Sequence, residues 1–221
     1  STRTDLQPHK RPFAHEHAPI PTLEAAVREL RPTALIGVAA QPKAFSEPVV
    51  RAMAEVAPRP IIFALSNPTS KAECTSEEAY RWTEGRALFA SGSPASPVTL
   101  DGHQFIPRQA NNVYIFPGLG LGVVASQATA VTERMFLAAA RALAGTVSRG
   151  DLADGSLFPK LESIRTTSAI IATAVIKVAV VEGLATAEIP ADIQGWVTER
   201  MYQPVYRSIP TDRRQPALAA S

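Results

Sequence analysis

An apolar run followed by a cluster of turn formers is the feature that most constrains how this chain folds. Pro60 to Leu65 is wholly apolar, and the sequence then changes abruptly to Ser66-Asn67-Pro68-Thr69-Ser70. A short run without polar residues is typical of a strand that is covered on both faces, as in a parallel sheet flanked by helices. Pro68 favours an extended backbone at Asn67, which would fix the direction of the Asn67 amide.

Strand and helix patterns alternate on either side of this run. Thr33–Ala39 and Arg86–Ala90 are two further apolar segments. Ser46–Val56 has apolar residues at helical spacing, and Thr75 with Glu78 predicts a capping box at the start of another helix. This order predicts an α/β fold with a partial doubly wound (Rossmann-type) parallel sheet. Ligands bind at the carboxyl ends of the strands in such sheets, where Asn67 is expected.

The segments outside this pattern are of three kinds. Residues 1–21 are polar and contain four prolines, so we expect an irregular lead-in, followed by a helix over Thr22–Leu30. Val98–Phe105 predicts a hairpin, because its central Asp-Gly is a strong turn signal. Helical spacing then predicts a helical C-terminal layer, with helices at Pro117–Ala130, Thr132–Ser148, Ser163–Glu182 and Ile193–Tyr202.

Composition and charge disfavour several classes of function. The net charge of +2 is spread along the chain without a basic stripe, so we expect no nucleic-acid partner. Cys74 is the only cysteine, which excludes an internal disulfide and predicts an inert, buried thiol. The longest apolar stretch, Ser168–Val181, is shorter than a bilayer span, and Lys177 interrupts it. We therefore expect a cytoplasmic protein with no membrane partner.

Three sequence blocks, in order, carry a family resemblance. R-P-I-I-F-A-L-S-N-P-T-S-K-A-E-C begins at Arg59, F-A-S-G-S-P covers residues 89–94, and N-N-V-Y-I-F-P-G covers residues 111–118. Together they resemble the malic enzymes, which oxidise and decarboxylate malate with a nicotinamide cofactor and a divalent metal. The resemblance runs from about Pro12 to Pro210 but covers only the later half of a malic enzyme. We therefore interpret the chain as a fragment or as one piece of a longer protein.

The resemblance implies a division of the chain into four parts. We expect an irregular lead-in at 1–21, the second half of an NAD(P)-binding Rossmann-type domain at 22–130, C-terminal helices packing on it at 131–210, and a disordered tail at 211–221. The first half of such a domain would carry a G-x-G-x-x-G loop between a strand and a helix, and this chain has none. Its glycine-rich run, Gly118 to Gly122, follows Pro117 and has a spacing that suits close helix packing.

The resemblance places no catalytic residue and no metal ligand in this chain. Malic enzymes use a tyrosine, a lysine and a cluster of metal-binding carboxylates, all of which would precede residue 1. The cofactors implied are NAD or NADP and a divalent metal, Mg or Mn, bound by parts that are not in this chain. Neither Tyr80 nor Tyr114 matches a catalytic position, so we expect both to be core or interface rings.

Amide side chains are the candidate substrate ligands. An uncharged Asn can hold a carboxylate through its NH₂ while its oxygen accepts from a hydroxyl or amide donor. By the resemblance, Asn67 contacts malate and approaches the nicotinamide ribose, and Asn111 and Asn112 add a second substrate contact. The alternatives are an Asx turn at Asn67 and loop capping by the Asn111-Asn112 pair.

The candidate cofactor residues come from three segments. Val38 to Ala40 fit a family segment that runs along the cofactor, whereas Gln41-Pro42-Lys43 departs from its small-residue pattern. Lys10 matches a lysine of NADP-preferring members, so NADP is favoured over NAD, although a solvated charge is the alternative. The full cofactor set is Val38, Ala39, Ala40, Leu65, Ser66, Asn67 and Lys10.

The leading hypothesis is the C-terminal NAD(P)-binding portion of a malic enzyme, a decarboxylating malate dehydrogenase. The complete protein would convert (S)-malate to pyruvate and CO₂ with reduction of NAD(P), and this portion alone would be inactive. One alternative is a non-catalytic Rossmann-type binding or assembly module, and another is a different Rossmann-type dehydrogenase. The nearly all-apolar helices predict a homo-oligomer.

Overall fold

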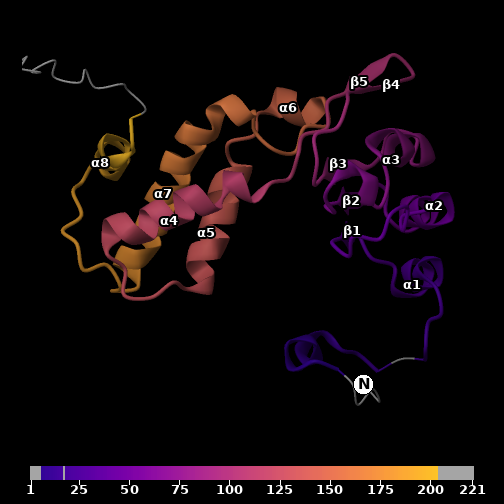
Figure 1. The fold of residues 1–221 in the computed structure, drawn as a ribbon, viewed down its shortest axis with the longest axis horizontal. Helices are drawn as coiled ribbons and strands as arrows, with labels where there is room; N and C mark the ends of the chain where they lie inside the picture. Colours follow the sequence, from indigo (N-terminus) through magenta and orange to yellow (C-terminus); the bar gives the residue numbers. More distant parts are fainter. Residues whose placement is uncertain (1–5, 17, 204–221) are drawn as a thin grey trace, which may run out of the picture.

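The computed structural model describes residues 6–16 and 18–203 (Figure 1). The predicted disordered tail, Thr211–Ser221, lies outside the described residues. Two parts lie side by side in Figure 1, an α/β part that contains the early strands and a part made of the later helices. The lead-in, predicted to be irregular, instead contains a 3₁₀ helix, η1 (Pro8–Phe13). Pro8 is tolerated at its start because the first N–H of a helix has no partner within the helix, so the N–H that proline lacks is not missed.

A three-stranded parallel sheet forms the centre of the α/β part. Its strands are β1 (Ala34–Gly37), β2 (Ile61–Ala64) and β3 (Leu88–Ser91), in the order β1-β2-β3. The helices α2 (Glu47–Val56) and α3 (Ser76–Trp82) connect them. The predicted α/β class and parallel pairing are thus confirmed. In the register, the last residues of the three strands are neighbours, so their carboxyl ends lie along one edge.

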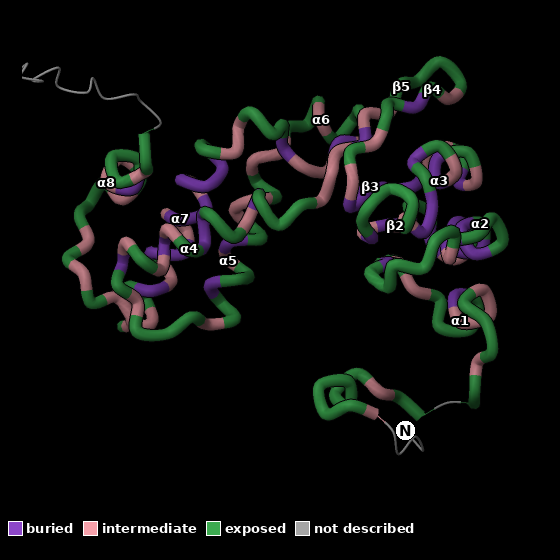
Figure 2. The backbone as a smooth tube through the Cα atoms, in the orientation of Figure 1, coloured by how far each residue is buried: buried purple, intermediate pink, exposed green. Residues whose placement is uncertain are grey.

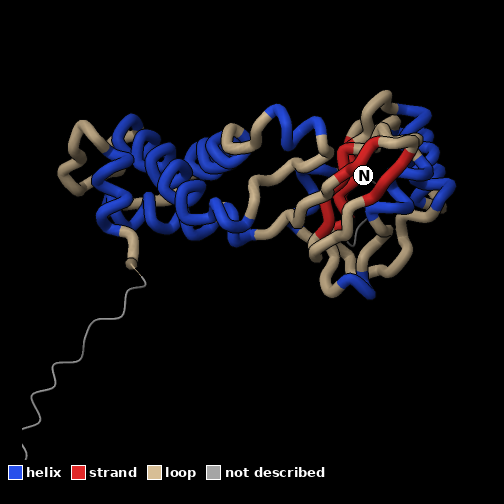
Figure 3. The backbone as a smooth tube through the Cα atoms, turned by 90° about the horizontal axis from the view of Figure 1, so that it is seen from above, coloured by secondary structure: helices blue, strands red, loops and turns tan. Residues whose placement is uncertain are grey.

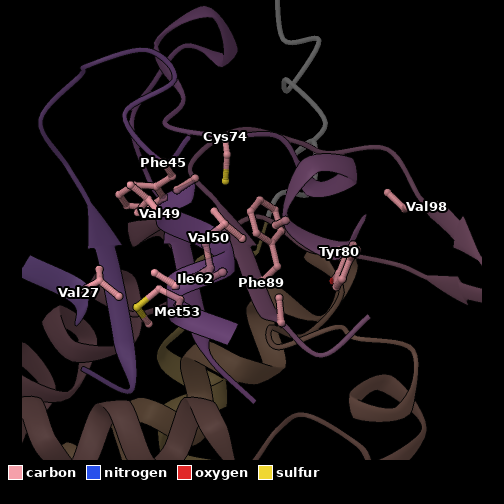
Figure 4. Packing of buried hydrophobic residues seen from close by; sticks show 14 residues of the cluster. Val27, Phe45, Val49, Val50, Met53, Ile62, Cys74, Tyr80, Phe89 and Val98 are labelled. Carbon is pink, nitrogen blue, oxygen red and sulfur yellow. The ribbon is translucent and has the colours of Figure 1, made fainter. Parts of the chain in front are cut away.

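The helices of the α/β part cover only one face of the sheet. The helix α1 (Leu23–Leu30) lies with α2 and α3 on this face, where Val27, Met53, Ile62 and Phe89 are all buried (Figures 1 and 4). The opposite face holds Ile36, which is 57% exposed. The prediction that the Pro60–Leu65 strand is covered on both faces is therefore confirmed only in part, because β2 has no exposed residue but Ile61 and Phe63, on this opposite face, are only partly buried. The physical reason is that both crossover helices of a β-α-β-α-β run lie on the same side.

Local sequence signals account for the ends of these elements. Thr22 accepts a hydrogen bond from the Ala25 N–H at 3.1 Å and caps α1. Thr75 and Glu78 form the predicted capping box of α3. The hairpin of β4 (Val98–Leu100) and β5 (His103–Phe105) turns at Asp101-Gly102, whose φ angles of 49° and 79° suit a tight hairpin turn.

The helical part contains the four predicted helices and one that was not predicted. They are α4 (Phe116–Ser126), α5 (Glu133–Ala144), α7 (Ile164–Val181) and α8 (Ile193–Arg200). The additional helix, α6 (Arg149–Ala153), begins at a capping box of Ser148 and Asp151. Three further 3₁₀ turns are η2 (Thr69–Lys71), η3 (Asn112–Tyr114) and η4 (Leu161–Ser163). Figure 2 shows buried residues where α4 and α7 meet.

Glycines let α4 approach α7 closely. A Cβ atom added at Gly118 would lie 2.7 Å from the Ile171 Cβ, and one added at Gly122 would lie 2.8 Å from the Val175 Cβ. Both distances are shorter than real carbon contacts, so neither position accommodates a side chain without a shift of the helices. The prediction that this glycine run serves helix packing is confirmed. Gly120, between them, faces open space.

The helix α7, with 18 residues, is the longest element of the described residues. Together with η4 it spans Leu161–Val181, 21 residues, which is long and apolar enough to cross a membrane by length and composition alone. The apolar stretch considered in the sequence was shorter than this helix. However, 44% of its most apolar window is buried inside the protein, and α4, α5 and α8 pack around it. A core helix passes the same test, so this finding is weak support for a membrane span.

Loops join the α/β part to the helical part (Figure 3). The Phe63 ring of β2 lies 6.4 Å from the Phe158 ring, and the Tyr114 hydroxyl donates to the Pro159 carbonyl at 2.9 Å. The helix α4 packs on α7 in this structure, although it precedes the expected boundary at residue 130. The division into 22–130 and 131–210 stays a prediction.

The glycine contacts give a test that compares two neighbouring positions of α4. Gly120→Ala should raise the free energy of unfolding by about 0.5–1 kcal/mol, because alanine restricts the unfolded chain and meets nothing in the folded one. Gly122→Ala should lower it by roughly 1–3 kcal/mol, because the methyl group would overlap Val175. Urea denaturation followed by circular dichroism measures both. Equal effects at the two positions would contradict the close packing of α4 on α7.

Candidate functional site

The carboxyl edge of the sheet brings four chain segments into one row. The Leu65 N–H donates to the Gly37 carbonyl and the Gly92 N–H to the Ala64 carbonyl, each at 2.9 Å. Beyond β3, Ser91 forms a parallel bridge with Gln109. The segments 38–40, 65–67, 91–93 and 109–111 therefore follow one another along this edge, and they contain most of the predicted site residues.

Gly92 brings the loop after β3 against the turn after β2. A Cβ atom at Gly92 would lie 2.1 Å from the Leu65 carbonyl oxygen, so only glycine fits this approach. The next residue, Ser93, donates its hydroxyl to the Asn67 Oδ1 at 2.7 Å. Asn67 is exposed, and its peptide bond to Pro68 is cis. The Asn67 oxygen is thus oriented by Ser93, and this leaves the Asn67 NH₂ as the group that can donate to a ligand.

Asn111 caps a 3₁₀ turn, as the structural alternative predicted. Its Oδ1 accepts from the Val113 N–H at 2.9 Å, at the start of η3. Asn111 also lines a cavity of about 300 Å³, together with residues 94–95 and 160–162 among others. Asn112 is exposed and begins η3. Capping uses only the Asn111 oxygen, so its NH₂ can still donate to a ligand.

The segment before Asn111 is held by two residues that the sequence did not indicate, Arg108 and Gln109. The Arg108 guanidinium contacts the Asp151 carboxylate at 2.5 Å and donates to the Phe158 carbonyl at 2.7 Å. Hydrogen bonds from Ser148 and from Arg108 hold the pKa of Asp151 below its usual value. The Gln109 amide donates to the Gly92 carbonyl at 2.7 Å. These partners are far apart in sequence, so no local pattern could have revealed them.

The loop after β1 is exposed and has an unusual backbone. Val38 is 73% exposed. Ala40 and Lys43 have φ angles of 52° and 60°, in the left-handed region that favours glycine. Such φ angles are consistent with the small residues that the family pattern has in this loop. The Gln41-Pro42-Lys43 segment of this chain departs from that pattern. The Lys43 ammonium contacts the Glu78 carboxylate of α3 at 2.6 Å. The Lys43 side chain therefore pairs with α3.

Glu73 is a buried carboxylate that sequence analysis missed. It is 1% exposed and accepts hydrogen bonds from the hydroxyl and the N–H of Ser66, the latter at 3.4 Å. The Ser66 hydroxyl in turn accepts from the Ala40 N–H at 2.9 Å. These bonds link two segments of the predicted cofactor set, 38–40 and 65–67.

The remaining predicted residues lie as follows. Lys10 is exposed in η1. Tyr80 is fully buried and stacks on Phe105 with ring centroids 4.2 Å apart, and burial raises the pKa of Tyr80. Tyr114 is buried as well, so both tyrosines are the core or interface rings that the sequence predicted.

The single thiol is buried, and the acidic side chains of the described residues form no metal-ligand group. Cys74 is 1% exposed, and burial raises the pKa of its thiol to about 12, so it stays protonated at neutral pH. Across residues 6–16 and 18–203, the structure has no group of three or more His, Cys, Asp and Glu side chains placed to hold a metal ion.

Comparison with known families and proteins gives consistent matches. The family model described as "Malic enzyme, NAD binding domain" matches residues 1–180. The chain is 50% identical over 209 residues to "NADP-dependent malic enzyme, chloroplastic" of Zea mays, covering 94% of this chain and 33% of that protein. The same identity, length and coverage hold for the protein of that name from Oryza sativa subsp. japonica. The chain thus spans about a third of the length of these relatives.

The fold also matches a solved structure of a malic enzyme. The crystal structure of malic enzyme from Pyrococcus horikoshii Ot3 superposes with a TM-score of 0.59 at 25% identity. The match covers 80% of this chain and 35% of the other.

The predicted cytoplasmic location is wrong. The maize and rice relatives are both named chloroplastic, which points to plastids. The single cysteine and the interrupted apolar stretch, on which that prediction rested, do not distinguish the cytoplasm from a plastid.

The matched residues coincide with the geometry described above. The family model spans the parallel sheet, the row of segments at its carboxyl edge and most of α7. It therefore includes each predicted site residue, from Lys10 to Asn112. Because this match covers well over half of the sequence, the chain belongs to the malic enzyme family and forms part of its NAD-binding domain.

Proposed function

We propose that this chain is the C-terminal NAD(P)-binding portion of an NADP-dependent malic enzyme. In the complete protein, the reaction is the oxidative decarboxylation of (S)-malate to pyruvate and CO₂. Support comes from family membership and from relatives named NADP-dependent. The observation that carries the proposal is the arrangement of Asn67, which Ser93 and Gly92 hold at the carboxyl edge of the sheet.

The carboxyl edge has a shape that suits part of a dinucleotide. Val38, Ala39 and Ala40 are exposed beside the end of β1. The left-handed φ angle at Ala40 favours a residue with a small side chain at this position. Leu65 and Ser66 follow the end of β2 beside them. We propose that these residues line one side of the nicotinamide ribose. The chain has no glycine-rich phosphate loop after a strand, so its own affinity for the cofactor is weak.

NADP supplies the hydride acceptor when bound, and this chain's residues orient the substrate. The Asn67 oxygen accepts from Ser93, so its NH₂ is directed to a carboxylate of malate. The NH₂ of Asn111, and the side chain of Asn112, provide the second contact beside the cavity. Neutral amides hold the substrate without cancelling the charge of a metal bound elsewhere. The described residues contain no group of three or more His, Cys, Asp and Glu side chains placed to hold a metal ion, so the divalent metal is proposed to bind to other parts of the complete protein.

The complete protein is proposed to assemble from several copies. Exposed apolar side chains gather on α5 and near the end of α7, among them Phe136, Leu137, Val180 and Val181. Burial of such side chains favours association. The alternative function, a non-catalytic binding or assembly module, is disfavoured by family membership. Malate is the proposed small-molecule partner.

The isolated chain should be inactive. We expect no malate-dependent reduction of NAD or NADP above background with Mg²⁺ or Mn²⁺, because the catalytic tyrosine and lysine lie outside it. The full-length protein should reduce NADP under the same conditions. Absorbance at the nicotinamide band measures both. Turnover by the chain alone would contradict the assignment of catalysis to other parts of the protein.

Removal of the Asn67 amide should weaken substrate binding. In the full-length protein, Asn67→Ala should cost about 1–3 kcal/mol in kcat/KM for malate, the usual cost of leaving a charged partner without its donor. Ser70→Ala, an exposed residue of the same turn, is the matched control and should leave the kinetics unchanged. Normal kinetics for Asn67→Ala would show that Asn67 is only a turn residue.

Lys10 should determine the preference for NADP. Lys10→Gln in the full-length protein should raise the KM for NADP by roughly tenfold, about 1.4 kcal/mol for one lost charged contact, and leave the KM for NAD unchanged. Arg11→Gln is the neighbouring control in η1. An equal change for both cofactors would show that Lys10 does not bind the 2′-phosphate.

A further inference from the structure

Glu73 stands out among the titratable residues because it is buried without a direct role in the proposed chemistry. It is 1% exposed, and a carboxylate in such a place is costly unless hydrogen bonds satisfy it. Its two oxygens accept from two donors of one residue, the hydroxyl and the N–H of Ser66. A carboxylate is the side chain that offers two acceptors to such a pair.

The Ser66 hydroxyl has only one proton, so its partners have fixed roles. The proton is donated to Glu73, and the hydroxyl oxygen is therefore the acceptor for the Ala40 N–H at 2.9 Å. Glu73, Ser66 and Ala40 form a directed chain of hydrogen bonds. This chain connects the turn after β2 to the loop after β1, the two segments that are proposed to contact the cofactor.

The carboxylate is also held in place by the backbone around it. A Cβ atom at Gly37, the last residue of β1, would lie 2.4 Å from the Glu73 Cδ, so the carboxylate packs directly on this backbone. The Phe45 N–H donates to the Glu73 carbonyl at 3.1 Å and fixes the far end of the same loop. Ala40, between these two points, has its left-handed φ of 52°. A conformation of this kind persists only where surrounding contacts determine it.

We propose that Glu73 is a positioning residue for the dinucleotide, which it serves by orienting Ser66 and, through Ser66, the Ala40 backbone. Glu73 does not contact the cofactor in this scheme. It sets the distance between the ends of β1 and β2, so that segments 38–40 and 65–67 present one continuous surface. The inference rests on the proposed function, since it assigns a cofactor to that surface.

A double-mutant cycle in the full-length protein tests this role. Glu73→Gln replaces one acceptor by an NH₂, so one Ser66 donor loses its partner, while Ser66→Ala removes the hydroxyl. Each should raise the Kd for NADPH, measured by its fluorescence, by about tenfold, the worth of roughly one hydrogen bond. The double variant should also lose about tenfold and not a hundredfold, because both changes break the same chain. A multiplicative loss would overturn the proposal.

Controls separate positioning from stability. Glu77→Gln alters an exposed carboxylate of α3 that pairs with Arg81, and should leave the Kd unchanged. Ser66→Thr keeps the hydroxyl and should restore binding to near the wild-type value. If Glu73→Gln does not fold, the contrast between Ser66→Ala and Ser66→Thr decides the question. Equal Kd values for these two would overturn the proposal, whereas a lower Tm with unchanged Kd would assign Glu73 to stability alone.

The Kd measurement is independent of turnover. A wild-type protein that binds NADPH but does not oxidise malate would contradict the proposed function and leave the role of Glu73 intact. A protein that oxidises malate, with the same Kd in wild type and in the Glu73→Gln and Ser66→Ala variants, would contradict the role of Glu73 and leave the function intact.

Discussion

Parallel hydrogen bonding among β1, β2 and β3 is the interaction on which the candidate site depends. Its register aligns Gly37 with Ala64 and Ala64 with Ser91, so three loops leave the sheet at one edge. A slip of one residue would turn every side chain of a strand to the other face. It would also move Asn67 away from Ser93. The positions of the amides thus follow from backbone pairing more than from any contact they make themselves.

Glycines allow close packing between neighbouring segments in both parts of the molecule. Gly37 and Gly92 admit Glu73 and the Leu65 carbonyl at the sheet edge, while Gly118 and Gly122 admit α7. In each case the neighbour occupies the space of an absent Cβ. The absence of a Cβ atom at glycine therefore permits close packing both in the site and in the helical layer. Gly120 shows by contrast that a glycine in the same run can lack this role, since it faces open space.

Local patterns in the sequence predicted what depends on neighbours in the chain. The caps at Thr22 and Thr75 and the Asp101-Gly102 turn follow from side chains within a few residues, and all three are present. The sequence could not predict the contact of Glu73 with Gly37 or of Arg108 with Asp151, because nothing local specifies which distant segments meet. The family resemblance indicated Asn67, and the structure added Ser93 as the partner that orients it.

The order of the strands along the sheet also bears on how it assembles. Each pairing joins strands that are consecutive in the sequence, β1 with β2 and β2 with β3. The registers Ala34–Ile61 and Ile61–Leu88 enclose loops of equal length. Since the entropy lost on closing a loop depends on its length, the two closures cost the same. Loop entropy therefore favours neither pairing over the other. Both pairings require β2, so the sheet cannot form without this strand.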